Sequence, residues 1–568
     1  MKPPEGDNRL GDCRSLLASL SEAIPAVRSF RGRWKAISAT LDRLRTAVND
    51  IADLPGNELS DELLSSLSQT LAVTLSLFQS CCAPEPPAGR LRAQSDLAAA
   101  ASFLDQHAAD ADLLLRSGAL LDPLPPKIPA SSACTAKKGT VRREALRNEA
   151  RTLVTRLQIG SVASRVAALS SLMVLIGGDD KNVVIAAAQG LVPALVRFLD
   201  YSSQSYPDAT EKAVGAIARV SSVESCRYLL VAEGNSLLSH LFRVLVEPDG
   251  SGSTKEKACA ALETLTFQRD VAMSVGAGGS ISVVLQTCRT GTPPAQATAA
   301  GVLKHLAAQK ELRQNFLLEG AVPVLIQILR SGTVLAQENA AACLSNLIAG
   351  EEEQNLKLDI FQEGGLDCLR NYWETAAANH RDLEPAIRFL RNLSSSTFWA
   401  ELILSFGFLF RIILALDSSS GSIRIEAARA VAELGNASTE KSSKEGVEQA
   451  VPRLTRMLEA KGAEEKEAAV TALASLMPFP ICRRMMRKDE KGIINVIMLL
   501  DPLVCNVEKK HAVSVLLAIS QARQCRKLVV AAGARGFMPW LESTQVEGAK
   551  RLSEILAKGK LLGVFPRS

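Results

Sequence analysis

The stretch Gly-Ala-Val-Pro-Val-Leu-Ile-Gln-Ile-Leu-Arg-Ser-Gly at residues 320–332 decides the fold class. Gly320 can end one helix, because glycine adopts the left-handed cap conformation without steric cost. Pro323 then fits the first turn of the next helix, where a missing N–H costs nothing. The leucines and isoleucines that follow fall on one helical face, and the Ser-Gly pair ends the helix.

This phrase recurs along the chain. A close copy is Gly-Leu-Val-Pro-Ala-Leu-Val at 190–196, and weaker copies begin at intervals of 41 to 45 residues, at Gly234, Gly279, Gly365, Gly407, Gln449, Gly492 and Gly536. Around 320, further helices are predicted over 336–348 and 355–362. One such unit cannot bury its own apolar face, so successive units must stack into a continuous core. The period is typical of helical repeat arrays.

The phrase at 320–332 and the segment Gln-Glu-Asn-Ala-Ala-Ala-Cys-Leu-Ser-Asn-Leu at 337–347 together resemble an armadillo repeat. Three helices per unit favour armadillo over HEAT repeats. The resemblance covers about residues 148–540. We therefore expect an all-α chain whose residues 148–568 form an armadillo-type α-solenoid superhelix of nine to ten repeats with a C-terminal helical cap.

Residues 1–121 have a different pattern. From Trp34 to Ile51, apolar residues recur at steps of three and four, which places them on one helical face. Four such amphipathic segments predict an N-terminal four-helix bundle, with Pro25 kinking the first helix. Residues 122–147 are rich in proline and then basic, so we expect a solvated, extended linker. The basic cluster leaves a nuclear-import signal open as an alternative.

The whole layout resembles a plant family of armadillo-repeat superfamily proteins, often called vacuolar-protein-like. Phrases that carry this resemblance are Val-Arg-Ser-Phe-Arg-Gly-Arg-Trp at 27–34, Gln-Ser-Asp-Leu at 94–97 and Asp-Lys-Asn-Val at 180–183. The N-terminal region is also similar to the helical domain that precedes the U-box in plant U-box/armadillo ubiquitin ligases. The U-box itself is absent, so the resemblance implies scaffolding and not ligase activity.

Composition excludes several classes. Lys and Arg total 65 against 60 Asp and Glu, an overall balance that gives no case for a nucleic-acid or anionic-membrane partner. Twelve scattered cysteines without a C-x-x-C pair predict reduced thiols in an intracellular protein, in the cytoplasm or nucleus, without disulfides or zinc. No motif of an enzyme, a cofactor or a metal site occurs, and no apolar stretch predicts an integral membrane segment. The oligomeric state is not predicted.

In armadillo families the last helix of each repeat lines the concave surface, and importin-like members place an Asn near its end and a Trp four residues earlier. The Asn position here holds Arg219, Thr264, His305, Asn346, Asn392, Glu433, Ser475 and Ala518. The Trp position holds Gly215, Ala260, Gly301, Ala342, Arg388, Arg429, Thr471 and Ser514. Without any Trp, the resemblance does not extend to import cargo.

The candidate groove residues are Arg219, Thr264, Lys304, His305, Asn346, Arg388, Arg391, Asn392, Arg429 and Glu433. Because several are basic, we expect a positive groove that binds acidic or phosphorylated extended segments of partner proteins. The predicted function is a non-enzymatic interaction scaffold. Two alternatives stay open: a substrate-recruiting or regulatory partner in ubiquitin ligation, and a membrane-tethering adaptor acylated on Cys13, Cys81 or Cys82.

Overall fold

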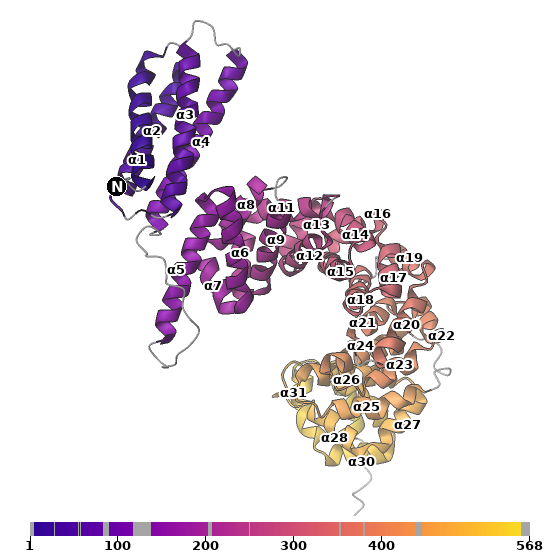
Figure 1. Ribbon diagram of the computed structural model, residues 1–568. Helices are drawn as coiled ribbons and strands as arrows, with labels where there is room; N and C mark the ends of the chain where they lie inside the picture. Colours follow the sequence, from indigo (N-terminus) through magenta and orange to yellow (C-terminus); the bar gives the residue numbers. More distant parts are fainter. Residues whose placement is uncertain are drawn as a thin grey trace, which may run out of the picture. The chain divides into compact units, whose positions relative to one another are not determined.

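The computed structural model describes residues 5–27, 29–54, 56, 58–82, 90–117, 138–202, 207–248, 250–350, 354–378, 381–437 and 446–557. The regular structure in these residues is helical throughout (Figure 1). The chain forms two compact units, Met1–Leu265 and Thr266–Ser568. Among the described residues no single helix is long and apolar enough to cross a membrane, although four pairs of bent neighbouring helices meet that criterion jointly.

The first unit begins with long helices at the positions that the apolar periodicity predicts. They are α1 (Glu5–Ala23), α2 (Arg31–Ala52), α3 (Glu58–Cys82) and α4 (Arg90–Ser117). These helices share one core, to which they contribute Leu17, Leu41, Leu67 and Leu104 in turn. Proline lies where the first helix ends, in the short 3-10 helix η1 (Ile24–Ala26).

Helix α5 (Lys138–Ile159) corrects the expected linker. Residues 138–147 are helical, and the remaining linker residues up to 137, with the prolines, lie outside the described residues. The C-terminal end of α5 packs against the base of the first four helices, where Ile159 joins the apolar cluster of Ile51, Leu63 and Leu114. Amphipathic periodicity did not reveal this helix, because its N-terminal half is polar and the described side chains there, at 142–148, are not buried.

Repeats follow α5 in the first unit. Their helices are α6 (Val162–Gly178), α7 (Asp180–Ala188), α8 (Leu191–Ser202), α9 (Pro207–Ser222), η2 (Glu224–Cys226), α10 (Arg227–Ala232), α11 (Gly234–Val246) and α12 (Gly252–Thr266). Each repeat has a short first helix, a second helix and a third helix that packs on the third helix of a neighbouring repeat, as α6 does on α9.

The second unit continues this order: α13 (Arg269–Ala277), α14 (Ser280–Thr290), α15 (Pro293–Ala307), η3 (Lys310–Leu312), α16 (Arg313–Leu318), α17 (Ala321–Ser331), α18 (Val334–Leu347), α19 (Gln354–Gln362), α20 (Gly365–Ala378), α21 (Glu384–Leu393), α22 (Thr397–Ser405), α23 (Phe408–Ala415), α24 (Gly421–Ala437), η4 (Val447–Gln449), α25 (Ala450–Met457), α26 (Ala463–Leu476), α27 (Pro480–Lys488), α28 (Glu490–Met498), α29 (Lys509–Ile519), α30 (Arg523–Ala531), η5 (Ala534–Phe537), α31 (Met538–Ser543) and α32 (Ala549–Ala557). Its third helices, from α15 to α32, stack in succession. Figure 1 shows α18, α21 and α24 along the inner side of this unit's curve, with α17, α20 and α23 outside.

The landmark glycines behave as their chemistry predicts. Gly320 has φ 61°, and α17 begins at the next residue. Gly190, Gly234, Gly279 and Gly407 are also left-handed.

In three weaker copies the left-handed glycine is not the residue that begins the phrase. It is Gly364 beside Gly365, Gly446 before Gln449 and Gly533 before Gly536. Near Gly492 an aspartate replaces it: Asp489 Oδ1 accepts the Gly492 N–H at 2.8 Å and caps α28. A side-chain oxygen satisfies a free N–H at the start of the helix, so a left-handed glycine is unnecessary there.

Arginines in the first helix of several repeats hold the C-terminal end of the preceding third helix. The donors are Arg227, Arg313, Arg483 and Arg526, and the acceptors are the carbonyls of Ser221, Ala307, Met477 and Ser520, at 2.7 to 3.4 Å. The last carbonyls of a helix have no partner within the helix and carry its negative dipole end, so a cation is favourable there. These four arginines are therefore structural.

Close stacking of α24 on α26 depends on Gly435. A Cβ added at Gly435 would lie 2.6 Å from the Ser475 hydroxyl oxygen and 3.3 Å from the Ser475 carbonyl oxygen. At Gly215 in α9, an added Cβ would meet only ordinary contacts, the nearest at 3.4 Å from the flexible Lys257 side chain. The two glycines thus differ in the space beside them.

We predict opposite signs for alanine at these two positions. Alanine in a helix normally stabilises by about 0.5–1 kcal/mol relative to glycine. Gly435→Ala should instead destabilise by about 1–3 kcal/mol, because α24 and α26 must separate. Gly215→Ala should be neutral or stabilising. Thermal and urea unfolding of the full chain measures both, and equal behaviour of the two variants would contradict this account of the stacking.

Asp110 lies where α4 meets the first repeats. Its side chain is 5% exposed, and its Oδ1 is 3.9 Å from Arg197 Nη2 on α8. Burial raises the pKa of the Asp110 carboxyl from 3.8 to about 6, against the opposing charges of Arg197 and Arg165. The folded chain therefore holds this proton more tightly than the unfolded chain. The protonated carboxyl therefore favours the folded chain. This contribution to stability is complete below about pH 4 and is lost as the pH rises from about 4 to 6.

Asp110→Asn should remove this pH dependence. At pH 7.5 the variant should be more stable than the wild type, by at most about 3 kcal/mol, because a neutral amide carries no charge-burial cost. At pH 4 the two should be nearly equal. The difference between their unfolding midpoints, measured at both pH values, checks this prediction. A difference independent of pH would contradict it.

Candidate functional site

The candidate residues divide between the two units. Arg219 lies on α9 and Thr264 on α12 in the first unit, and the other eight lie on α15, α18, α21 and α24 in the second. We call the side of the second unit formed by the third helices α15, α18, α21, α24, α26 and α29 the inner face.

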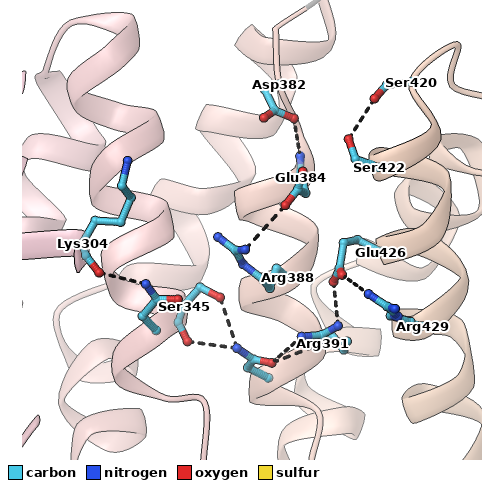
Figure 2. Close-up of polar contacts among 12 residues, drawn as sticks. Lys304, Ser345, Asp382, Glu384, Arg388, Arg391, Ser420, Ser422, Glu426 and Arg429 are labelled. Carbon is cyan, nitrogen blue, oxygen red and sulfur yellow. Dashed lines mark hydrogen bonds and ion pairs between the residues drawn. The ribbon is translucent and has the colours of Figure 1, made fainter. Parts of the chain in front are cut away.

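Both candidate asparagines connect neighbouring third helices. Asn346 Nδ2 on α18 donates to the Lys304 carbonyl on α15 at 2.9 Å. Asn392 Nδ2 on α21 donates to the Ser345 carbonyl and hydroxyl on α18, at 3.0 and 3.2 Å (Figure 2). These donors satisfy backbone carbonyls of the preceding helix, and each bond contributes about 1 kcal/mol to stacking.

A chain of charges continues across the next helices. Arg391 Nη1 on α21 lies 2.8 Å from Glu426 Oε2 on α24, and Glu426 Oε1 lies 2.8 Å from Arg429 Nη1 (Figure 2). Arg429 Nη2 then reaches Glu464 Oε1 on α26 at 2.8 Å. The Glu426 side chain is only 10% exposed and serves two arginines, so it is the centre of this network.

Arg388 is the least satisfied of the candidate arginines. Its Nη1 is 3.5 Å from Glu384 Oε1, at the limit of a hydrogen bond. Its buried Nε has no hydrogen-bond partner among the described residues. The side chain is 30% exposed, so solvent reaches part of the guanidinium group. Arg388 therefore keeps donors available on the inner face.

The remaining candidates of the second unit have mixed environments. Lys304 Nζ donates to Asn339 Oδ1 at 2.8 Å. His305 Nδ1 is 3.2 Å from the Thr266 hydroxyl, and its ring meets Phe267 edge to face. Glu433 is exposed on α24. Of Lys304, His305 and Glu433, only Glu433 is exposed to solvent.

In the first unit, Arg219 is fully engaged. It donates to the Ile176 carbonyl at 3.1 Å, to Ser222 at 3.0 Å and to Asp180 Oδ1 at 2.6 Å. The Thr264 hydroxyl donates to carbonyls of its own helix, the closer being Ala261 at 2.8 Å. Both side chains therefore support local packing.

The inner face consequently has mixed charge where the sequence suggested a positive groove. Sequence reasoning missed the carboxylates that face the arginines, namely Glu384, Glu426 and Glu464. Two of them were detectable, because Glu384 precedes Arg388 by four residues and Glu426 precedes Arg429 by three, and such residues are neighbours on a helix. The Arg429–Glu464 pair joins different repeats and had no local signal.

His511 lies beside two carboxylates. Ligand atoms of Glu467, Glu508 and His511 lie within 4.8 Å of one another, between α26 and α29. Burial lowers the pKa of the His511 imidazole, so the ring is neutral near pH 7. Lys510 Nζ lies 2.5 Å from Glu508 Oε2, which already gives this carboxylate a cationic partner.

Comparison with known proteins agrees with this architecture. Residues 318–349 match the family described as Armadillo/beta-catenin-like repeat, and residues 11–119 match a domain of unknown function (DUF7032). No curated protein matches the chain. An engineered protein from the Northeast Structural Genomics Consortium is 20% identical, with a TM-score of 0.60 over 72% of this chain and 98% of that one.

Two further solved structures resemble parts of the chain. One belongs to computationally designed armadillo repeat proteins for modular peptide recognition, at 21% identity and a TM-score of 0.37 over 42% of this chain and 98% of that one. The other is a designed armadillo repeat protein, at 18% identity and a TM-score of 0.36 over 50% of this chain and 98% of that one. The stacked three-helix repeats and the armadillo match define the chain as an armadillo-type α-solenoid.

We predict that Glu426 is required for stability and Glu433 is not. Glu426→Gln should destabilise the second unit by about 1–3 kcal/mol, because Arg429 loses a charged hydrogen-bond partner and Arg391 loses its ion-pair partner. Glu433→Gln is the matched control on the same helix and should change stability by less than about 0.5 kcal/mol. Unfolding in urea distinguishes the two variants. A Glu426 variant as stable as the control would show that the network adds nothing to folding.

Proposed function

We propose that the chain is a non-enzymatic scaffold whose inner face binds an extended segment of a partner protein. The observation that carries this proposal is the regular polar row on successive third helices, from Lys304 and Asn346 to Arg388 and Arg429. An extended chain has unpaired N–H and C=O groups along its length. A row of side-chain donors and acceptors on four successive third helices suits such a ligand.

Within this row, we assign Arg388 as the anchor for an acidic or phosphorylated side chain of the partner. Its guanidinium group is partly exposed and its Nη1 contact with Glu384 is long, so its Nη donors can meet the two oxygens of a carboxylate or phosphate. Arg391 and Arg429 already share Glu426, so an anion must compete with that carboxylate for them. The preference for anions is therefore local to Arg388 and not a property of the whole face.

The burial of two cysteines argues against membrane attachment through acylation. Cys13 and Cys81, two of the three cysteines considered for acylation, are 0% and 5% exposed. Burial also raises the pKa of the Cys13 thiol to about 11, which keeps it protonated and unreactive at neutral pH. The Cys82 side chain lies outside the described residues. A role beside a ubiquitin ligase remains a second hypothesis, which rests on the N-terminal resemblance.

The test uses the full chain and synthetic twelve-residue peptides in three sets: phosphoserine-containing, acidic and basic. Fluorescence anisotropy should rank the phosphorylated and acidic sets above the basic set. Arg388→Glu should weaken that binding about tenfold or more, the value of one charged hydrogen bond. Arg388→Lys should weaken it less, because the charge remains while the forked geometry is lost.

Arg289→Glu is the matched control, since Arg289 is exposed on α14, a second helix outside the inner face. This variant changes the net charge by the same amount as Arg388→Glu, but it should leave peptide binding unchanged. Stronger binding of the basic peptides, or equal losses in the Arg388 and Arg289 variants, would overturn the assignment of Arg388. Melting temperatures of all three variants should match the wild type.

A further inference from the structure

The first helices of the last repeats carry a concentration of positive charge that the inner face does not use. The sequence of α27 is Pro-Ile-Cys-Arg-Arg-Met-Met-Arg-Lys, and that of α30 is Arg-Gln-Cys-Arg-Lys-Leu-Val-Val-Ala. Neither contains a carboxylate. Three other first helices of the second unit, α13, α19 and α22, each contain a carboxylate, namely Asp270, Asp359 and Glu401.

The two helices lie next to each other at the C-terminal end of the second unit (Figure 1). The Cys525 thiol of α30 is 3.8 Å from the Arg487 carbonyl oxygen of α27. Arg487 Nη2 in turn donates to the Ala518 carbonyl at the end of α29, at 3.3 Å. The charges of α27 and α30 therefore act on one continuous surface.

Part of this charge is structural and part is free. Arg483 and Arg526 donate to carbonyls at the ends of the preceding third helices, and Arg487 donates to a carbonyl at the end of α29, the third helix of its own repeat. The other four cations are exposed and form no hydrogen bond or ion pair with any described residue; they are Arg484, Lys488, Arg523 and Lys527. We call these four the basic edge. Unpaired cations held close together attract an anionic partner.

The neighbours of the basic edge indicate which anionic partner it fits. Ile481 and Met485 are 44% and 36% exposed, and they share the outer face of α27 with Arg484 and Lys488, at helical steps of three and four. Exposed aliphatic side chains between cations suit a membrane surface, where apolar groups enter the interface and cations meet headgroups. Single-stranded nucleic acids are typically held by aromatic stacking, and neither helix contains an aromatic residue.

We infer that the basic edge, with Ile481 and Met485, is a docking surface for anionic lipid headgroups. It is formed by first helices, so it leaves the third helices of the inner face free, and it requires no acylated cysteine. Headgroup phosphates would contact Arg484 and Lys488 on α27 and Arg523 and Lys527 on α30. Attraction to such a surface falls as salt screens the charges.

The test is vesicle flotation of the full chain at about 0.1 M salt. The vesicles are pure phosphatidylcholine, phosphatidylcholine with phosphatidylserine, and phosphatidylcholine with a phosphoinositide. We expect binding to both anionic vesicles, none to the neutral ones, and loss at high salt. Reversal of the basic edge (Arg484→Glu, Lys488→Glu, Arg523→Glu and Lys527→Glu) should reduce binding more than a hundredfold, at roughly fivefold for each cation.

A control variant carries the same change of charge elsewhere in the second unit: Arg289→Glu, Lys310→Glu, Arg330→Glu and Lys461→Glu. These side chains are also exposed. It should float like the wild type, and all variants should melt at the wild-type temperature. No flotation with anionic vesicles, or equal loss in both variants, would overturn the inference.

Two further arms separate the sources of phosphate. Ile481→Ser with Met485→Ser should weaken vesicle binding severalfold, while leaving any binding of soluble inositol hexakisphosphate unchanged. An equal effect on vesicles and on inositol hexakisphosphate would indicate a site for soluble phosphates and contradict the lipid assignment. Binding of a single-stranded RNA in preference to vesicles, lost on reversal of the basic edge, would replace the lipid with a nucleic acid.

Discussion

The close approach of successive third helices is the constraint on which the rest of the structure depends. No repeat can bury its own apolar face, so each third helix must lie against the next with small residues between them. Gly435 beside Ser475 shows how little room remains. The same proximity brings polar side chains of one helix to the backbone carbonyls of its neighbour, as Asn346 and Asn392 demonstrate.

This constraint explains why residues of the inner face serve stacking and recognition together. A side chain at the end of a third helix is close to both the preceding helix and the solvent. Asn392 and Arg391 are largely committed to neighbouring helices, whereas Arg388 has a partly exposed guanidinium group with only a long contact to Glu384. A surface of this kind recognises a ligand through its uncommitted groups, and the committed groups keep the spacing of the row regular.

The cations of the chain divide in the same way. Arginines such as Arg313 and Arg526 sit at helix ends and offset the negative end of the helix dipole. Arg429 balances carboxylates across repeats. The cations of the basic edge on α27 and α30 take part in neither kind of pairing among the described residues. Net charge alone, which is small, hides this uneven distribution.

The sequence by itself determined the local elements and their repetition, because a cap glycine, a first-turn proline and an apolar face at helical spacing act within a few residues. Gly320, Pro323 and the bounds of α17 follow from such local rules. It did not reveal α5, whose N-terminal half is polar, or the charge balance of the inner face. The tertiary structure decided that balance: Arg391 meets Glu426, and Arg429 meets Glu464, only because separate repeats stack in register. Contacts between residues so far apart along the chain depend on packing geometry, which no local pattern encodes.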